Sequence, residues 1–73
     1  MKEDIFLNII GKTLSNQRQI SEISLQELSA KTGIDAEKIL EIEMGKIPLD
    51  LEEFLTITAA IGIDAAKIIN EIH

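Results

Sequence analysis

The chain has 73 residues, and its thirteen acidic and seven basic side chains give it a net charge of −6. It holds no cysteine, so no disulfide can cross-link it, and its one histidine, His73, is the last residue. A chain of this length forms one domain at most, and its stability has to come from apolar packing. Hydrophobic residues make up 45% of the sequence, and with Phe6 and Phe54 as the only aromatics we expect an aliphatic core.

These bulk properties argue against several functions. A net charge of −6 argues against a generic nucleic-acid or anionic-membrane binder, which would carry a basic patch. No apolar run approaches the roughly 20 residues that span a bilayer, and the opening "MKEDIF" has acids where a signal peptide would be basic. We therefore expect a cytoplasmic protein. Since no zinc-binding cluster, phosphate loop or catalytic set of titratable groups is present, we expect no metal, cofactor, small-molecule substrate or enzymatic activity.

Apolar residues recur at helical spacing along the chain, and no segment alternates as a strand would. The first helix is expected over residues 4–20, where an i, i+4 stripe is formed by Phe6, Ile10 and Leu14. The second is expected over residues 25–32. Ser24 and Glu27 fit a capping box at its start, and Gly33 can supply the left-handed residue that ends it.

Three more helices are expected, each beginning after an aspartate that can cap its first free N–H groups. In chain order, these aspartates are Asp35, Asp50 and Asp64. The three helices end near Met44, Gly62 and Ile72. Gly45 stops the first of them, and Glu53 stands at the capping-box position of the second. These helix starts and ends predict an all-α fold, with five short helices packed as a single domain over residues 1–73.

The second and third helices are joined by a tight turn. Ser29, a small residue four positions before Gly33, would let the two backbones approach closely. The residues that would pack the third helix against the second are Ile34, Ile39 and Ile42. Helices joined by a three- to four-residue turn with glycine form a helix-turn-helix motif. We therefore predict such a motif over about residues 25–44.

This segment, "LSAKTGIDAEKILEIEMGK", resembles the Cro/C1-type (lambda-repressor-like, XRE) helix-turn-helix family, whose pattern is L-A-x-x-T-G-I-S followed by I-x-x-I-E-x-G-K. The matching residues are Leu28, Thr32, Gly33, Ile34, Ile39, Ile42, Glu43, Gly45 and Lys46. The front of the chain, "IIGKTLSNQRQISEIS", is similar to the family's L-G-x-x-I-R-x-L-R-x-x-x-G-L-S, and "LDLEEFLTITAAIGID" is similar to its next segment. The resemblance covers nearly the whole chain. It implies a compact five-helix fold that usually acts as a dimer on palindromic operators, with its third helix in the major groove.

The surface that would face DNA carries unusual side chains for this family. By the resemblance, it consists of Leu25, Ala36, Glu37, Lys38, Leu40 and Glu41. Relatives commonly place Gln, Arg, Ser, Thr or Asn at the positions of the third helix. At the start of the second helix, where this chain has Leu25, they usually carry Gln. Arg, Lys, Gln and Asn read base edges efficiently, and this face offers only Lys38 of that set. Its carboxylates would lie within the ~8 Å Debye length of phosphates, so the pattern is more typical of a protein-binding patch.

Several neighbouring residues have other duties. Asp35 is most simply an N-cap, and Glu43 matches a family position that supports the fold. Gln17 stands where relatives carry leucine, so helix one is either shifted in register or less tightly packed at its end. Three isoleucines either extend the apolar patch or belong to the core: Ile20, Ile23 and Ile47.

The leading hypothesis is a small transcription-regulatory protein whose third helix contacts another regulatory protein, for example as an antirepressor or a mimic of DNA charge. Self-association as a homodimer is also possible. The alternative is a conventional dimeric, sequence-specific DNA-binding regulator. Its phosphate contacts would come from Lys12, Arg18, Lys31 and Lys46, beside Lys38 on the third helix. A third hypothesis makes the chain one module of a larger regulator, or a dimerisation unit.

Overall fold

Five helices and no strand make up residues 2–72, the part of the chain whose backbone the computed structural model describes; side chains are described for residues 7–68 and for Asn70. The helices are α1 (Lys2–Ile20), α2 (Leu25–Thr32), α3 (Ala36–Glu43), α4 (Leu51–Ile61) and α5 (Ala65–Ile72). The predicted all-helical fold is confirmed, and the predicted helix ends agree with the observed ones to within a turn of helix. Within this part of the chain, no helix combines the length and the apolar character that crossing a membrane requires.

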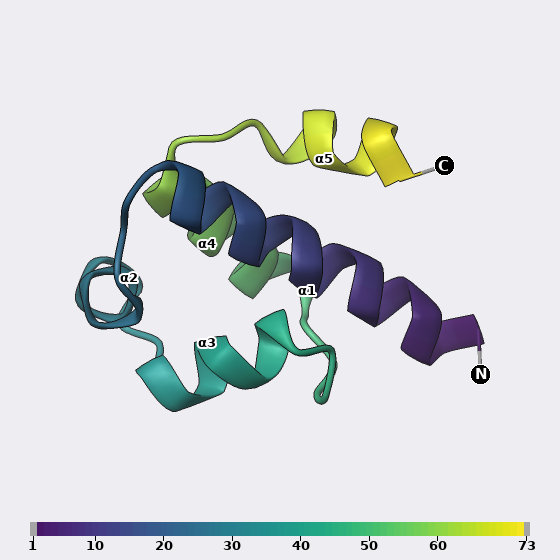
Figure 1. Ribbon diagram of the computed structural model, residues 1–73, viewed down its shortest axis with the longest axis horizontal. Coiled ribbons are helices and arrows are strands. Elements are labelled where there is room, and N and C mark those ends of the chain that lie inside the picture. Colours follow the sequence, from purple (N-terminus) through teal and green to yellow (C-terminus); the bar gives the residue numbers. More distant parts are fainter. Residues whose placement is uncertain (1, 73) are drawn as a thin grey trace.

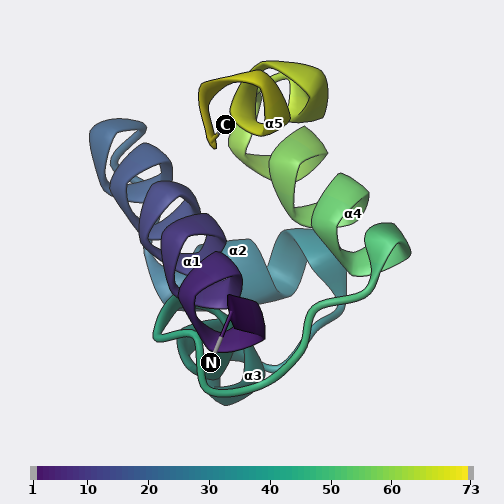
Figure 2. The same ribbon diagram turned by 90° about the vertical axis from the view of Figure 1, so that its right-hand side faces the viewer.

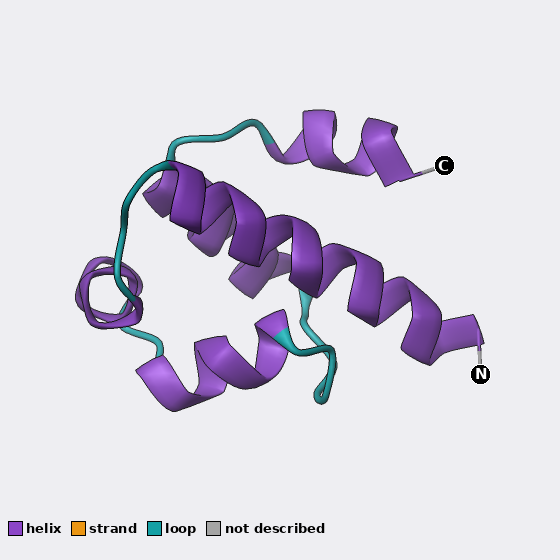
Figure 3. Cartoon of the chain, in the orientation of Figure 1, coloured by secondary structure: helices purple, strands orange, loops and turns teal. Residues whose placement is uncertain are grey.

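The long helix α1 organises the arrangement. In Figure 1 it runs across the molecule with α3 on one side and α5 on the other, and both contact it. The side view in Figure 2 shows α1 and α4 as two flanks, with α2 between them and in contact with α4 and α3. The connections between the helices are short loops (Figure 3). The five helices therefore enclose one common centre.

Among the described side chains, the core is aliphatic apart from Phe54, and all five helices contribute to it. Its buried residues are Ile10, Leu14, Leu28, Ile39, Ile42, Phe54, Ile57, Ile61 and Ile68. Phe6, predicted to share the stripe on the first helix, lies outside the described side chains. Of the isoleucines with two possible roles, Ile23 and Ile47 pack against the core, whereas Ile20 is 72% exposed.

Three of the predicted caps form hydrogen bonds. The hydroxyl of Ser24 accepts from the Glu27 N–H at 3.0 Å, and the Glu27 carboxylate accepts from the Ser24 N–H at 3.2 Å, so the capping box is confirmed. Asp50 accepts from the N–H of residue 53 at 2.7 Å. Asp64 accepts from the Ala66 N–H at 3.0 Å. Each bond satisfies an N–H that has no partner inside its own helix.

Two details of the predicted capping were wrong. The Asp35 side chain makes no capping hydrogen bond; its backbone angles, φ −56° and ψ 138°, differ from those of Ser24, at φ −77° and ψ 163°. The Glu53 carboxylate does not return to the Asp50 N–H, because it pairs with Lys38 of α3 instead. Both carboxylates therefore stay near the surface of α3.

Glycine permits the crossing of α1 and α3. A Cβ atom built on Gly11 would lie 2.4 Å from the carbonyl oxygen of Ile42 and 2.6 Å from that of Glu43, so a side chain cannot fit there. At Gly33, a φ of 77° ends α2 in the left-handed conformation, as predicted. The main chains of α1 and α3 lie close together at Gly11, and the chain turns out of α2 at Gly33.

Glu22 occupies a conformation that favours glycine. Its φ is 58°, and in the described part of the chain no other residue except glycine has a positive φ. The N–H of Ile23 donates to the Arg18 carbonyl at 3.1 Å, and the N–H of Glu22 donates to that of Gln19 at 3.0 Å, which closes the end of α1 as a Schellman motif. The family pattern quoted above has glycine at this position. A side chain in this conformation costs about 1–2 kcal/mol.

Glu22→Gly should therefore raise the free energy of unfolding by about 1 kcal/mol, because it removes the Cβ atom that strains the left-handed backbone. Urea denaturation followed by circular dichroism measures the change. Glu22→Ala is the matched control, since it removes the same carboxylate but keeps the Cβ atom. Equal stability of the glycine and alanine variants would contradict the assignment of strain.

Candidate functional site: the outward face of helix α3

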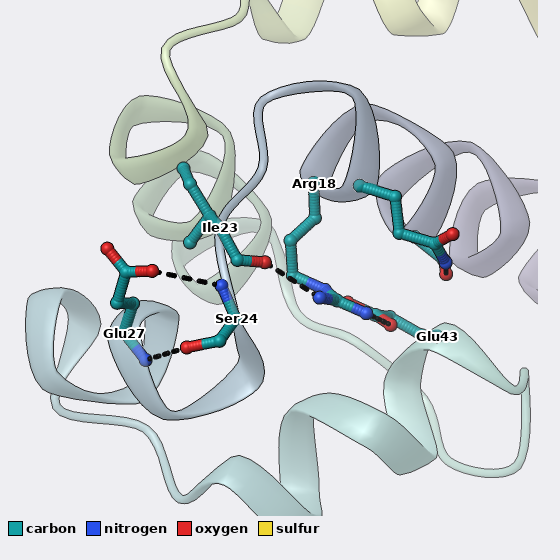
Figure 4. Close-up of polar contacts among 7 residues, drawn as sticks. Arg18, Ile23, Ser24, Glu27 and Glu43 are labelled. Carbon is teal, nitrogen blue, oxygen red and sulfur yellow. Dashed lines mark hydrogen bonds and ion pairs between the residues drawn. The ribbon is translucent and has the colours of Figure 1, made fainter.

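A buried ion pair holds the base of α3. The Arg18 Nε and Nη2 atoms donate to the two carboxylate oxygens of Glu43 at 2.8 Å and 3.1 Å, and Nη1 donates to the Ile23 carbonyl at 2.8 Å (Figure 4). The Arg18 side chain is 12% exposed and that of Glu43 is 4% exposed. The pair thus ties the end of α1, the turn before α2 and the end of α3 to one another.

This contact places Arg18 inside the fold. Its Nε, Nη1 and Nη2 atoms all donate within the protein and little of the side chain reaches solvent, so the guanidinium is not free to contact phosphate. Glu43 has the supporting role expected of it. Its carboxylate is neutralised, so it adds no negative charge to the surface of α3.

The opposite side of α3 faces solvent. The buried residues of this helix are Ile39, Ile42 and Glu43, which lie together on its inner side. Outward lie Glu37 and Glu41, both exposed, with Leu40 at 41% exposure and Met44 at 50%. We call these four residues the α3 face. Met44 was missed by sequence reasoning, although its spacing of four residues from Leu40 and three from Glu41 could have identified it.

Lys38 is the basic residue of α3, and it is engaged by a neighbouring helix. Its Nζ donates to the Glu53 carboxylate of α4 at 2.5 Å, and their side chains are 45% and 19% exposed. This hydrogen bond and the charge of Glu53 raise the pKa of Lys38 above its ordinary value, with smaller contributions from Asp50 and Asp35. The ammonium is therefore charged and compensated by carboxylates of its own chain.

The remaining predicted residues are dispersed. Leu25 is half-buried and packs against the core, so it adds little to an exposed patch, and Ala36 is half-buried at the start of α3. The exposed lysines proposed as phosphate contacts come from α1, α2 and the loop after α3: Lys12, Lys31 and Lys46. The structure thus brings together the acidic and apolar part of the predicted surface, and spreads its basic part over three elements.

Other surfaces of the described residues offer less chemistry. A half-open cavity of about 300 Å³ lies between α1 and the α4–α5 connection, lined by Gln17, Gly62, Ile63, Asp64, Lys67 and Ile68. It lies beside Gln17, where the family pattern has leucine, which is consistent with looser packing at the end of α1. In the part of the chain that the structure describes, no three His, Cys, Asp or Glu side chains are placed to hold a metal ion.

Breaking the buried ion pair should be costly. Arg18→Met should lower the free energy of unfolding by about 3 kcal/mol, because it leaves the buried Glu43 carboxylate without its cation. Arg18→Met combined with Glu43→Leu should recover most of this loss, since both charges are then removed. Urea denaturation of the two variants and the original chain measures the coupling. A double variant no more stable than the single one would argue against the pair as the cause.

Removal of the Glu53 charge should lower the pKa of Lys38 toward the ordinary value of 10.5, because Glu53 is the main cause of its rise. A pH titration of the Lys38 Cε resonance by NMR in Glu53→Gln tests this. Because the folded-state pKa is raised, the pair stabilises the fold fully at neutral pH and loses this effect as pH rises through the raised pKa. Glu52→Gln is the control, since Glu52 does not contribute to the shift and its removal should leave the titration unchanged.

Comparison with protein-family models and with curated proteins finds no match in either. The resemblance to the Cro/C1-type family is therefore carried by the motif residues of the sequence alone.

Proposed function

We propose that this chain is a small transcription-regulatory protein of the Cro/C1-type helix-turn-helix fold whose α3 face binds a protein. In this proposal α2, the turn at Gly33 and α3 form the helix-turn-helix, and α3 is the helix that in the family enters the major groove. The partner is another regulatory protein, and the chain modulates it as an antirepressor or as a mimic of DNA charge.

The observation that carries the proposal is the ion pair between Lys38 and Glu53. Lys38 is the only basic residue in the sequence of α3, and Glu53 compensates its charge. What the helix then offers to a partner is the pair of exposed carboxylates of Glu37 and Glu41. Asp35 adds a third carboxylate at the helix start, because its side chain makes no capping hydrogen bond.

This charge pattern opposes DNA binding. Affinity for DNA comes largely from phosphates neutralised by cations or N–H donors, and most protein–DNA hydrogen bonds go to phosphate and sugar. Arg18 is held by Glu43, and the exposed lysines proposed for phosphate lie on three separate elements. In the major groove, the carboxylates of Glu37 and Glu41 would meet phosphates of the same sign, and Lys38 on the same helix is already paired with Glu53.

The same pattern suits a protein partner with a basic surface. Leu40 and Met44 supply exposed apolar area beside the carboxylates, and methionine adapts its flexible side chain to different partners. Complementary charge directs the encounter and disfavours wrong partners, whereas burial of the apolar residues supplies affinity. A basic DNA-binding surface of another regulator has the chemistry that matches this face.

Two selections run side by side test the proposal: a pull-down from the source cells and a genomic DNA-binding selection at ~150 mM salt. We expect a specific protein partner and no enriched DNA sequence. In Glu37→Gln/Glu41→Gln, affinity for that partner should fall at least about tenfold, because the charges that attract it are gone. Glu52→Gln, an exposed acid on α4, is the control that should bind normally.

Tight, sequence-specific binding of the isolated chain to an operator at that salt would overturn the proposal. The conventional DNA-binding regulator would then be favoured, provided that binding falls steeply with salt and is lost in Lys38→Ala. A protein partner that binds the Glu37→Gln/Glu41→Gln variant with unchanged affinity would also contradict it, because the contact would then lie elsewhere.

A further inference from the structure

The half-open cavity between α1 and the α4–α5 connection, here called the α5 cavity, has the size of a small-ligand site. It opens on the side of α1 that carries α5, whereas α3 packs on the other side (Figure 1). Its volume of about 300 Å³ equals that of roughly ten water molecules in the liquid and lies at the lower end of the range for ligand pockets. The α5 cavity therefore has room for a molecule of about ten non-hydrogen atoms.

Three polar side chains line the α5 cavity, and each brings a different chemical group. Gln17 of α1 contributes an amide, which can both donate and accept hydrogen bonds. Asp64, in the connection before α5, contributes a carboxylate, and Lys67, in the first turn of α5, contributes an ammonium. Both charged residues are exposed, so they lie at the rim. One negative and one positive group at the rim of the same small cavity match a ligand that itself carries both charges.

The carboxylate of Asp64 is only partly used by the fold. One of its oxygens, Oδ1, accepts from the Ala66 N–H at 3.0 Å and so caps α5, while the other makes no hydrogen bond within the described part of the chain. The amide of Gln17 likewise makes no hydrogen bond with another described residue, and it lines the cavity. A carboxylate oxygen and an amide are thus available to a ligand without breaking a contact among the described residues.

Two isoleucines give the α5 cavity an apolar part. Ile68 belongs to the buried core at 3% exposure, and Ile63 is half-buried and packs against that core. Beside them the cavity is lined by Gly62, which has no side chain to fill it. A branched aliphatic group placed on this surface would be removed from water, which favours binding in proportion to the apolar area buried. The lining therefore combines an aliphatic surface with two opposite charges.

We propose that the α5 cavity binds a free aliphatic amino acid such as leucine. The ammonium of the ligand pairs with Asp64, and its carboxylate pairs with Lys67 and accepts a hydrogen bond from the Gln17 amide. Its side chain lies on the two isoleucines. A molecule with only one of the two charges leaves either Asp64 or Lys67 without a partner. Because both charged residues are exposed, their ion pairs are screened by water and the affinity is modest.

Amide NMR spectra of the intact chain, recorded during a titration with leucine, test the site. The signals of Gly62, Asp64 and Lys67 should shift and saturate, with a dissociation constant of about 1 mM. Isocaproate is leucine without its ammonium, and isoamylamine is leucine without its carboxylate. Each should bind about threefold to tenfold more weakly, because one charged group of the cavity then stays unpaired. Glycine, which lacks the aliphatic group, should also bind more weakly than leucine.

Two substitutions test the charged residues. Asp64→Asn keeps a residue that caps helices as well as aspartate does, but it removes the negative charge. Lys67→Gln removes the positive charge. Each should weaken the binding of leucine about threefold to tenfold. The matched controls are Asp50→Asn, the same change at the cap of α4, and Lys31→Gln on α2; neither residue lines the cavity, and both variants should bind leucine normally.

Gln17→Leu adds a readout that does not depend on the ligand. It replaces the amide with an apolar side chain, the residue that the family pattern has at this position. The midpoint of urea denaturation should rise, because the leucine can pack against Ile63 and Ile68. The binding of free leucine should weaken in the same variant, because the amide is gone and the apolar part of the cavity is covered. Weaker binding by a more stable chain excludes unfolding as its cause.

Three results would overturn the proposal: no saturable shift with leucine up to about 20 mM, isocaproate or isoamylamine binding as tightly as leucine, and unchanged affinity in both Asp64→Asn and Lys67→Gln. The site and the α3 face lie on different sides of α1 and can be tested apart. Glu37→Gln/Glu41→Gln should bind leucine as the original chain does. Failure of the α5 cavity to bind leucine would leave the protein-binding role of the α3 face standing.

Discussion

The buried ion pair between Arg18 and Glu43 decides where α3 can lie. Two charges taken out of water are tolerable only when each satisfies the other, and here the guanidinium also binds the carbonyl of Ile23. Any arrangement that moved α3 away from the end of α1 would leave a carboxylate or a guanidinium buried alone. This requirement sets the inner side of α3, and the inner side determines which residues of the helix point toward solvent.

Features set by residues close in sequence were predictable from the sequence. The capping box at Ser24 and the left-handed Gly33 follow from interactions spanning four residues or fewer, and both were confirmed. Of the two wrong capping predictions, that of Asp35 failed at its own backbone angles, and that of Glu53 failed because of a partner distant along the chain. Glu53 was expected to cap its own helix, but a lysine 15 residues earlier holds it. The contact of Arg18 with a glutamate 25 residues later was likewise not predictable from local sequence, and it holds the guanidinium inside the fold.

In the candidate site, too, features set by local spacing were predictable, whereas features set by the packing of distant helices were not. The acidic outward residues Glu37 and Glu41 were predictable from helical spacing once Ile39 and Ile42 were placed in the core. The half-burial of Leu25 and the exposure of Leu51 and Leu55 depend on how far apart the helices stand, which no local pattern encodes. The surface of α3 is more acidic than the residues of that helix suggest, because the charge of Lys38 is compensated by Glu53 of α4.

Gly11 makes a contact between α1 and α3 that does not involve the outer side of α3. At the crossing of α1 and α3, a Cβ atom on Gly11 would lie 2.4 Å and 2.6 Å from the main-chain oxygens of Ile42 and Glu43, so the close approach of the two helices there requires glycine. Substitutions on the outer side of α3 leave this contact unaltered. The side chains on the outer side of α3 can therefore be replaced one at a time while the helix keeps its position. Successive substitutions there can convert one surface chemistry into another without rebuilding the scaffold.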